Sequence, residues 1–412
     1  MTPAKKVLYV ENGIGYGGAI ICLRHLVRNL DRSKYHPIVV TGRTGPQYED
    51  IAKEAQWVHI RDRHLNIAAA RERLENIKWI KNRPLFRRIA SQVLARADDV
   101  GNFLPFLIRL LWVAKTNKVD LIHANNEPLC NRAALLAGKI LRVPTICHVR
   151  GNQDGTRLMR WAYSLPDYFV PVSFWVEKNI IENLGVSKNK TKVVYDGLEL
   201  EKLDINSDGT IFREKYGIPK EAFAVGLVGL LIPWKGQEIF LDAAAQLKQK
   251  IPNLKMVIVG GTPEDCVSYE RKLKKRVSDE GLTDTVIFTG HVDEMPIVYN
   301  GLDVVVSAST KPEPLGTMVI ETLAMGRPLI APNHGGGAEM VEHGVTGLLF
   351  EPGDANELAT MIQAYYEDRS LRQKVGRNGR IHALKTFDVR EHAENIQNIY
   401  DMVLRNGHRP PR

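Results

Sequence analysis

The sequence has few cysteines, and those it has lie far apart. The four cysteines of this 412-residue chain, Cys22, Cys130, Cys147 and Cys266, form no C-x-x-C pair. Disulfide frameworks have many cysteines in a short secreted chain, and structural zinc sites have closely spaced cysteine pairs, so four scattered cysteines are typical of reduced thiols. The pattern therefore argues against a small disulfide-stapled secreted domain and favours a cytoplasmic protein.

Long apolar runs are also missing. The longest one, Leu104–Val113, is interrupted by Pro105 and Arg109 and falls short of the roughly 20 residues that a membrane-spanning helix needs. The first residues, Met1-Thr-Pro-Ala-Lys-Lys, lead directly into the apolar run Val7–Val10, so we expect no signal peptide. We predict a cytoplasmic protein that is either free or peripheral on the cytoplasmic face of the inner membrane.

Motifs for metal ions and for an acyl-transfer nucleophile are absent as well. The sequence has no H-x-x-H, no clustered acidic triad, no D-x-D and no G-x-S-x-G elbow. Zinc sites, sites for hard divalent cations and hydrolase elbows are built on such patterns. We therefore expect metal-independent chemistry, with no metal site and no cofactor.

Positive charge is in excess, and it is concentrated in one segment. The net charge is +9, and residues 61–118 contain thirteen Lys and Arg against five Asp and Glu, a net of +8. Trp79, Phe86, Phe103 and Trp112 are interleaved with these charges. Such a mixture fits an amphipathic surface on anionic lipid, although a solvated helix face above ordinary core aromatics explains it equally well. No nucleic-acid-binding module accompanies the charge, so we expect no nucleic-acid partner.

Strand and helix patterns alternate along the whole chain, which is typical of doubly wound α/β folds. A first series of strands is predicted at Lys6–Val10, Pro37–Thr41, Leu121–Ala124, Thr145–Val149, Tyr168–Val172 and Lys192–Tyr195. A second series is predicted at Phe223–Val228, Lys255–Val259, Val286–Thr289, Val304–Ser307, Leu329–Ala331 and Gly347–Phe350. The polar segment between the two series predicts a boundary between two domains.

Two Rossmann-like domains that face one another across a cleft follow from this organisation. We predict an N-terminal domain over residues 1–198, a linker over 199–221 and a C-terminal domain over 222–388. The last segment, 389–412, is predicted to be a helix that packs back onto the N-terminal domain. Parallel strands carry ligands at their carboxyl ends, so the cleft is the expected site.

The most informative segment places two carboxylates around a strand-to-helix turn. A buried strand is predicted at Leu302–Ser309, a proline-broken loop then holds Glu313, and Gly316–Met325 predicts a helix that contains Glu321. A helix N-terminus presents free N–H groups and the positive end of its dipole, which suits a phosphate. A nucleotide-sugar would therefore fit here, with a carboxylate at either side to accept hydroxyls. The amides expected to hold its diphosphate are those of Leu315, Gly316 and Thr317.

Two further side chains at strand ends are candidates for catalysis. Lys235 follows the first strand of the second series, and it could reach a diphosphate as a point charge. His148 ends the strand Thr145–Val149, and it could donate to a sugar hydroxyl or steady a developing charge. Each also has a structural interpretation, as a surface loop lysine or as a histidine with its hydrogen bonds satisfied.

The loop after the first strand leaves two functions open. Gly13-Ile-Gly-Tyr-Gly-Gly18 contains a G-x-G-x-x-G pattern, which is typical of dinucleotide-binding turns. The second strand ends without the acidic residue that holds the ribose of NAD, although Arg43 would suit the 2′-phosphate of NADP. The interpretation we favour is a tight loop at Gly17 and Gly18 whose amides border a diphosphate or an acceptor.

Together these motifs resemble those of the retaining GT-B glycosyltransferases, and among them glycosyltransferase family 4, over nearly the whole chain. The most specific part is Glu313-Pro-Leu-Gly followed by Glu321-Thr-Leu-Ala-Met-Gly-Arg-Pro, which is similar to the E-x7-E signature of that family. Other matching segments follow in the family's order: the Gly17-Gly18 loop, His148-Val-Arg, Val194-Tyr-Asp-Gly197, Pro233-Trp-Lys-Gly236 and Gly335-Gly336.

The resemblance implies a metal-independent hexosyltransferase that uses a nucleotide-sugar as substrate. Glu313 would touch the hydroxyls of the donor sugar, and Glu321 would bind the ribose. Lys235 would hold the leaving diphosphate together with the amides near Gly316, and His148 would approach the sugar. The loop that ends at Val292 would meet the nucleobase. The N-terminal domain would take the acceptor, a saccharide or a lipid-linked saccharide of surface polysaccharide biosynthesis.

One position departs from the family pattern. The family usually has an arginine after the glycine of its V-G-R-L segment, and Leu230 stands there in this chain. Losing that cation could cost roughly 2–4 kcal/mol of transition-state stabilisation. A non-catalytic nucleotide-sugar binding protein therefore stays open as an alternative to transfer. A nucleotide-sugar epimerase on the same scaffold stays open too, because a glutamate and a histidine in the cleft could transfer protons.

Overall fold

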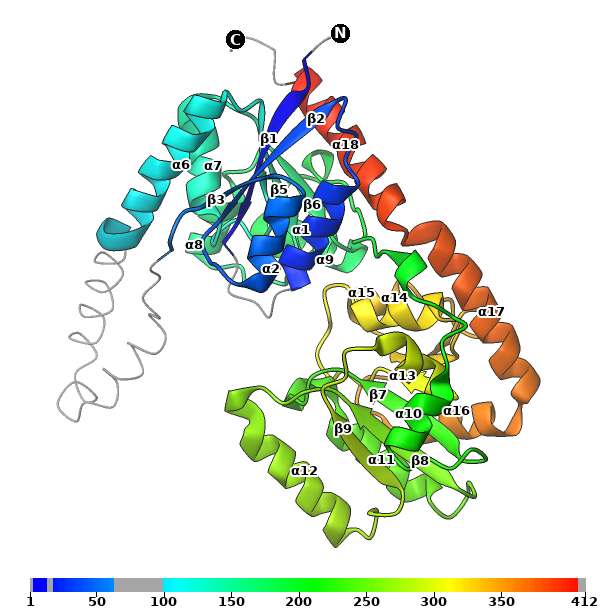
Figure 1. Ribbon diagram of the computed structural model, residues 1–412. Coiled ribbons are helices and arrows are strands. Elements are labelled where there is room, and N and C mark those ends of the chain that lie inside the picture. Colours follow the sequence, from blue (N-terminus) through cyan, green and yellow to red (C-terminus); the bar gives the residue numbers. More distant parts are fainter. Residues whose placement is uncertain (1–2, 13–17, 63–98, 407–412) are drawn as a thin grey trace, which may run out of the picture. The chain divides into compact units, whose positions relative to one another are not determined.

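The computed structural model describes residues 3–12, 18–62 and 99–406, which divide into two units (Figure 1). The first unit takes in Met1–Pro171, Glu177–Val194 and Ala393–Arg412, and the second takes in Val172–Val176 and Tyr195–His392. Among the helices in the described ranges, none combines the length and the apolar character needed to span a bilayer.

The first unit is built on a parallel sheet, which has six strands in the described part of the chain. They are β1 (Lys5–Glu11), β2 (Tyr35–Thr41), β3 (Gln56–His59), β4 (Leu121–Ala124), β5 (Thr145–Val149) and β6 (Tyr168–Pro171). Their order is β3-β2-β1-β4-β5-β6, so the direction of winding reverses between β1 and β4. Ligands of such sheets bind where the carboxyl ends of the strands meet this reversal.

Helices cover both faces of this sheet. They are α1 (Gly18–Arg28), α2 (Pro46–Glu49), α6 (Leu104–Asn117), α7 (Arg132–Leu141), α8 (Arg157–Tyr163) and most of α9 (Phe174–Leu184) and of α18 (Val389–Asn406), with short helical turns η1 (Asp50–Lys53), η2 (Asp99–Phe103) and η3 (Lys188–Lys190). Val7 and Tyr9 of β1 pack with α1 and α18, whereas Leu8 and Val10 pack with α6 and α7. Because the middle of β1 is buried on both faces, its residues Val7–Val10 are continuously apolar rather than alternating.

The second unit repeats this plan, again with six parallel strands among the described residues. The strands are β7 (Phe223–Val228), β8 (Leu254–Val259), β9 (Val286–Gly290), β10 (Val304–Val306), β11 (Leu329–Pro332) and β12 (Leu348–Phe350). The order is β12-β11-β10-β7-β8-β9, so the reversal of winding lies between β7 and β10. The predicted fold, two doubly wound Rossmann-like α/β units, is confirmed.

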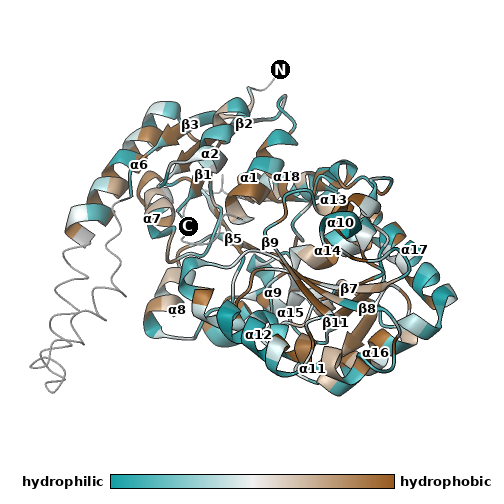
Figure 2. Cartoon of the chain, turned by 60° about the horizontal axis from the view of Figure 1, so that its bottom comes forward, coloured by the Kyte–Doolittle hydropathy of each residue, from teal (hydrophilic) through white to brown (hydrophobic). Residues whose placement is uncertain are grey.

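The helices of the second unit enclose its sheet on both sides. They are α10 (Gly209–Lys215), α11 (Gln237–Leu247), α12 (Val267–Asp279), α13 (Met295–Gly301), α14 (Thr317–Ala324), α15 (Gly335–Ala338), α16 (Ala355–Glu367) and α17 (Arg369–Thr386), with helical turns η4 (Leu200–Lys202), η5 (Pro233–Lys235) and η6 (Glu264–Cys266). Figure 2 shows the contrast between the mostly hydrophilic α12 and the hydrophobic strands beside it.

Three details differ from the sequence predictions. The segment 199–221, predicted as a linker, belongs to the second unit, where Phe212 of α10 is buried with Tyr299 of α13. The segment Lys192–Tyr195 is not a strand, because it runs beside the end of β6 with few ladder bonds, such as Lys192 N–H to Phe169 O at 3.2 Å. The short edge strand β3 was not predicted, since its four residues, QWVH, carry little apolar pattern.

Candidate active site

The predicted carboxylate and lysine meet at the winding reversal of the second unit. Lys235 follows β7, and Glu313 follows β10, the neighbouring strand on the other side of the reversal. The Lys235 Nζ lies 2.7 Å from Glu313 Oε2, and each side chain is 17% exposed. The Lys235 ammonium also lies 4.8 Å from the centre of the Trp234 ring, which favours a cation there. An ion pair partly shielded from water is thereby placed at the expected ligand edge.

Ser309 and His334, which the sequence analysis did not single out, hold the loop of Glu313. The Ser309 hydroxyl donates to Glu313 Oε1, so both carboxylate oxygens have partners. His334 Nε2 donates to the Ser309 carbonyl at 2.9 Å. Burial lowers the pKa of His334, so its ring is neutral near pH 7. Ser309 lies just beyond a strand end, and that position is the sequence signal that could have identified it.

The triple glycine of α15 packs against the same loop. The Gly336 N–H donates to the Glu313 carbonyl at 2.8 Å. A Cβ on Gly336 would lie 2.1 Å from the carbonyl oxygen of Pro314, and one on Gly335 would lie 2.6 Å from that of Glu313. Real Cβ atoms do not come so close to backbone oxygens, so this site needs glycine for close approach. The glycines thus fix the backbone that carries Glu313.

We expect Gly336→Ala to lower both the stability of the protein and the activity of this site. The new methyl group must push the Pro314 backbone away, which we expect to cost about 1–3 kcal/mol of unfolding free energy and to displace Glu313. Urea unfolding and initial rates measure the two effects. Gly337→Ala is the matched control, because its Cβ would lie at an ordinary 3.6 Å from the Leu315 carbonyl oxygen. Equal behaviour of the two variants would contradict this explanation.

The N-terminus of α14 opens beside Glu313. Gly316 is its N-cap residue with φ 90°, a left-handed conformation that suits glycine, and Thr317 is its first residue. Leu315 is buried, whereas Thr317 is exposed. Ser309, Glu313, Gly316 and His334 line a cavity here of only about 10 Å³, the space of one water. This cavity is too small to enclose a diphosphate, and the binding of one by the first amides of α14 stays a prediction.

Glu321 lies one turn into α14 and has its own partner. Tyr299 of α13 donates its hydroxyl hydrogen to Glu321 Oε2 at 2.6 Å. Burial raises the pKa of Glu321 above its ordinary value, and the Tyr299 hydrogen bond opposes that rise. Its other oxygen, Oε1, can accept a hydroxyl from a ligand. Nothing in the sequence around Tyr299 pointed to this contact.

Val292 follows β9 in the same unit. It is half-buried, and it packs against the cluster that contains Val298 and Tyr299 of α13. Because all strands of the sheet are parallel, Val292 lies at the edge that also carries Lys235 and Glu313. Its contact with a nucleobase stays a prediction.

The other predicted residues belong to the first unit. Gly17 lies outside the described residues, and Gly18 begins α1, where an added Cβ would meet no described atom within 4 Å. Nearby, the buried Asn125 donates from Nδ2 to Glu11 Oε2 at 2.5 Å and to the Ala19 carbonyl at 3.0 Å, so it joins β1, β4 and the start of α1. Glu11 and Ala19 flank residues 13–17, which lie outside the described residues.

His148 lies at the end of β5 and is fully buried. Its ring stacks on that of His123 at a centroid distance of 5.7 Å, and its Nδ1 lies 3.3 Å from a guanidinium nitrogen of Arg150. His123 in turn is 2.6 Å from the Tyr400 hydroxyl of α18. The ring of His148 has no exposed surface in the described structure, and its catalytic role stays a prediction.

The chain as a whole is similar to solved glycosyltransferase structures. A glycosyltransferase from Rickettsia africae ESF-5 has a TM-score of 0.82 and 20% identity, and the match covers 98% of this chain and 99% of that one. HepE of Anabaena, solved in complex with UDP, has a TM-score of 0.79 and 23% identity, over 96% of this chain and 100% of that one. At such identities the likeness shows the fold, the GT-B arrangement of two Rossmann-like domains.

Two family models match successive parts of the sequence. The model described as Glycosyltransferase Family 4 matches residues 16–202, and the one described as Glycosyl transferases group 1 matches residues 208–382. The chain is a GT-B glycosyltransferase similar to family 4. This glycosyltransferase is thus a transferase enzyme, so the dehydrogenase, epimerase and non-catalytic interpretations no longer apply.

Relatives of the glycosyltransferase have several named activities. YtcC of Bacillus subtilis strain 168 is 27% identical over 319 residues, which is 72% of this chain and 76% of YtcC. The lipopolysaccharide core biosynthesis mannosyltransferase LpsB of Rhizobium meliloti is 26% identical over 52% of this chain and 61% of its own length. A D-inositol 3-phosphate glycosyltransferase of Salinispora arenicola is 27% identical over 89% and 83%.

Proposed function

We propose that this glycosyltransferase moves a hexose from a nucleotide-diphosphate-sugar to an acceptor hydroxyl with retention of configuration. The observation that carries the proposal is the Lys235–Glu313 pair beside the N-terminus of α14, with 2.7 Å between Nζ and Oε2. A cation and free amides at one point of the sheet edge suit a diphosphate, and the carboxylate suits sugar hydroxyls. HepE of Anabaena, which has the same fold, was solved with UDP and with UDP-glucose, which supports this class of donor.

Each donor-binding residue has a part in this proposal. The amides of Leu315, Gly316 and Thr317 and the Lys235 ammonium would hold the diphosphate, while Glu321 would accept from the ribose. Val292 would present its backbone to the nucleobase. In the first unit, the acceptor side, the loop at Gly17 and Gly18 would border the acceptor, and His148 would approach the sugar. These roles rest on positions at strand ends and on the family resemblance.

The reaction we propose needs no protein nucleophile. The bond between the anomeric carbon and the diphosphate oxygen breaks, which leaves positive charge on the sugar ring and negative charge on the leaving group. The acceptor oxygen forms its bond on the same face, and its proton passes to the departing phosphate oxygen. Lys235 stabilises the leaving group, and Glu313 stabilises the sugar through charge and hydrogen bonds rather than through a covalent bond. This charge distribution is supplied by the chain itself, so we propose metal-independent catalysis.

A lipid-linked saccharide of surface polysaccharide biosynthesis is the acceptor we propose. The support is twofold: LpsB, a relative, is named for lipopolysaccharide core biosynthesis, and helix α6 presents an apolar ridge. Leu104, Ile108 and Trp112 lie four residues apart on that ridge, and Ile108 and Trp112 are 60% and 68% exposed. Arg109 and Lys115 beside them are exposed too. Apolar side chains flanked by cations suit the surface of an anionic bilayer.

The basic segment predicted to bind the membrane was 61–118. Residues 63–98 of it lie outside the described residues, so the proposed membrane surface uses only residues of α6. We propose that the protein is cytoplasmic and binds peripherally at the inner membrane. No disulfide joins the cysteines of the described residues, which is compatible with the reducing compartment that we propose. No nucleic-acid partner is proposed.

Replacing Ile108 and Trp112 together with serine is expected to weaken binding to anionic vesicles about tenfold or more. The two side chains lose the apolar area that they would bury among the lipids. Vesicle co-sedimentation with phosphatidylglycerol measures the effect, and binding of the parent protein should fall as salt rises. Ile381→Ser is the control, because Ile381 is equally exposed, 68%, but lies on α17. Vesicle binding that is absent in the parent, or the same in the double variant, would rule out this surface.

A panel of UDP-, GDP- and ADP-sugars tests the proposed function directly. We expect the free nucleotide to appear only when a saccharide or lipid-linked acceptor is present, and the rate to be unchanged by EDTA. NMR of the product then gives the anomeric configuration, which should match that of the donor. An inverted product would exclude the retaining mechanism, and a rate abolished by EDTA would exclude metal independence.

Leu230 gives a test by gain of function. It follows β7 in the same loop as Lys235, it is partly buried, and its carbonyl accepts from Gln237 Nε2 at 2.9 Å. Leu230→Arg leaves that backbone contact in place and adds a bidentate donor toward the leaving group. We expect kcat to rise by about tenfold, and Leu230→Lys to give a smaller rise because a point charge lacks the fork geometry. Steady-state kinetics measure both, and a fall in kcat for the arginine variant would place the diphosphate elsewhere.

A further inference from the structure

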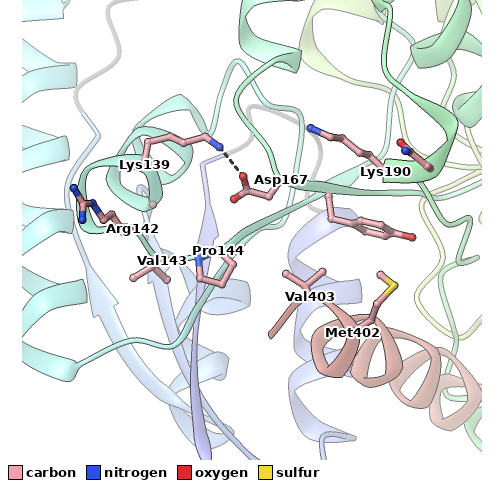
Figure 3. Close-up of a pocket in the computed structure, with 11 residues that line it drawn as sticks. Lys139, Arg142, Val143, Pro144, Asp167, Lys190, Met402 and Val403 are labelled. Carbon is pink, nitrogen blue, oxygen red and sulfur yellow. Dashed lines mark hydrogen bonds and ion pairs between the residues drawn. The ribbon is translucent and has the colours of Figure 1, made fainter. Parts of the chain in front are cut away.

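A large pocket lies at the opposite edge of the first unit's sheet, where β5 and β6 begin (Figure 3). Its volume is about 580 Å³, within the range of pockets that hold small molecules. The end of α7, the start of β6, the turn η3 and the last part of α18 line it, and all of them belong to the first unit. His148 and the glycine loop lie at the carboxyl ends of the strands, so this pocket is separate from the proposed acceptor side.

One half of the pocket is apolar. Val143 and Pro144 lie on the connection into β5, while Met402 and Val403 lie on α18 on the other side of the space (Figure 3). The ring of Tyr168 adds to this surface. These side chains can cover a hydrocarbon or ring portion of a ligand, which the hydrophobic effect would favour.

The other half of the pocket is rich in donors and positive charge. Lys139 and Lys190 reach toward the space from opposite sides (Figure 3), and Arg142 adds a third cation at the rim. Burial raises the pKa of Tyr168, which keeps its hydroxyl protonated. Asn189 Oδ1 already accepts from Ser187 Oγ at 2.7 Å, so the amide offers its N–H groups. Each polar side chain that remains for a ligand can therefore donate a hydrogen bond.

The one carboxylate of the lining is already satisfied within the protein. Asp167 Oδ1 lies 2.6 Å from Lys139 Nζ, and Asp167 Oδ2 accepts from the N–H and the hydroxyl of Thr145 at 2.9 and 2.8 Å. Asp167 thus fixes Lys139 at the pocket, while Lys190 has no ion-pair partner among the described residues. The three cations and one acid leave a net charge of +2 on the lining.

We propose that this pocket is a second ligand site, for a phosphate monoester that carries an apolar group. The phosphate lies between Lys139 and Lys190, and the apolar group lies against Pro144, Met402 and Val403. Phosphate combines negative charge with several acceptor oxygens, which matches a lining of cations and donors. A free phosphorylated metabolite and the head group of a phosphatidic acid both have this chemistry. The site does not depend on the proposed transfer reaction.

Calorimetric titration of the full-length protein with hexyl phosphate, with inorganic phosphate and with phosphatidic acid vesicles tests the proposal. We expect hexyl phosphate to bind, and Lys139→Gln with Lys190→Gln to weaken that binding about tenfold or more. Met402→Ala should weaken hexyl phosphate but leave inorganic phosphate unchanged. Binding of hexyl phosphate without vesicles identifies a free metabolite, whereas lysine-dependent binding of phosphatidic acid vesicles over phosphatidylcholine ones identifies a lipid head group.

The matched control is Lys192→Gln with Arg405→Gln, which removes two exposed cations close in sequence to Lys190 and Val403 but outside the lining. Thermal unfolding of each variant confirms that it is folded. The proposal is overturned if neither hexyl phosphate nor phosphatidic acid vesicles bind the parent, or if the control pair weakens binding as much as the pocket pair does.

Discussion

Replacing Glu313 with glutamine is expected to lower kcat by about 10²–10³-fold with little change in stability. The glutamine fills the same space and still accepts from Ser309, but it carries no charge to oppose the positive sugar or to hold Lys235 at 2.7 Å. Removing one preorganised electrostatic group from an active site has effects of this size. Steady-state kinetics measure the loss, and circular dichroism during heating measures the stability.

A surface carboxylate gives the control for this prediction. Glu367 ends α16 and is exposed, so Glu367→Gln should leave kcat unchanged. A Glu313→Gln variant with normal kcat would remove Glu313 from the chemistry. Lys235→Met gives a second test. If Lys235 and Glu313 act together, their effects on kcat are not additive. The variant with both Lys235→Met and Glu313→Gln should then be little slower than the slower of the two single variants.

Replacing Glu321 with glutamine is expected to weaken donor binding by about 1–3 kcal/mol, the cost of a charge-assisted hydrogen bond. The glutamine retains an acceptor for Tyr299, whose hydroxyl lies 2.6 Å from Glu321 Oε2. Calorimetric titration with the donor nucleotide measures the affinity. An unchanged affinity would remove the ribose role, and Tyr299→Phe tests whether the contact with Tyr299 orients the carboxylate.

The raised pKa of Glu321 adds a pH dependence to this result. Only the ionised carboxylate is the strong acceptor for ribose hydroxyls, so donor affinity should fall as the pH drops through this pKa. Because burial raises the pKa, the fall should begin at a higher pH than for an ordinary glutamate. The Glu321→Gln variant should lack this transition, and titrations over a range of pH show whether it does.

Stability should respond to Glu321 in the opposite direction. A carboxyl whose folded pKa is above its unfolded value binds more protons in the folded state, so it opposes folding once the pH exceeds the unfolded pKa. At pH 7 the buried charge of Glu321 therefore lowers the free energy of unfolding. We expect Glu321→Gln to unfold at the same or a higher temperature while it binds the donor less tightly. A variant that loses both stability and affinity would instead indicate a structural role.

Local sequence patterns predicted most of the elements that carry the site. The strand before Glu313, the turn at Gly316 and the helix with Glu321 were all predicted, and the structure has β10, a left-handed Gly316 and α14 there. These features depend on neighbours in the chain: a short apolar strand, a glycine that tolerates positive φ, and a helix that follows. The strand predicted at Lys192–Tyr195 was wrong, because the segment runs beside the end of β6 with too few backbone bonds to form a ladder. The local pattern of a segment does not encode how far its pairing with a neighbour extends.

The sequence by itself determined the two doubly wound halves, the resemblance to GT-B transferases and the candidate residues at the strand ends. Tertiary structure decided which of them meet. Lys235 and Glu313 lie 78 positions apart, and they form a pair because β7 and β10 are neighbours in the sheet. The contact of Tyr299 with Glu321, the support of Ser309 for Glu313 and the second pocket at β5 and β6 also depend on packing between distant segments. Strand order and helix packing bring such groups together, and periodicity along one segment does not encode that order.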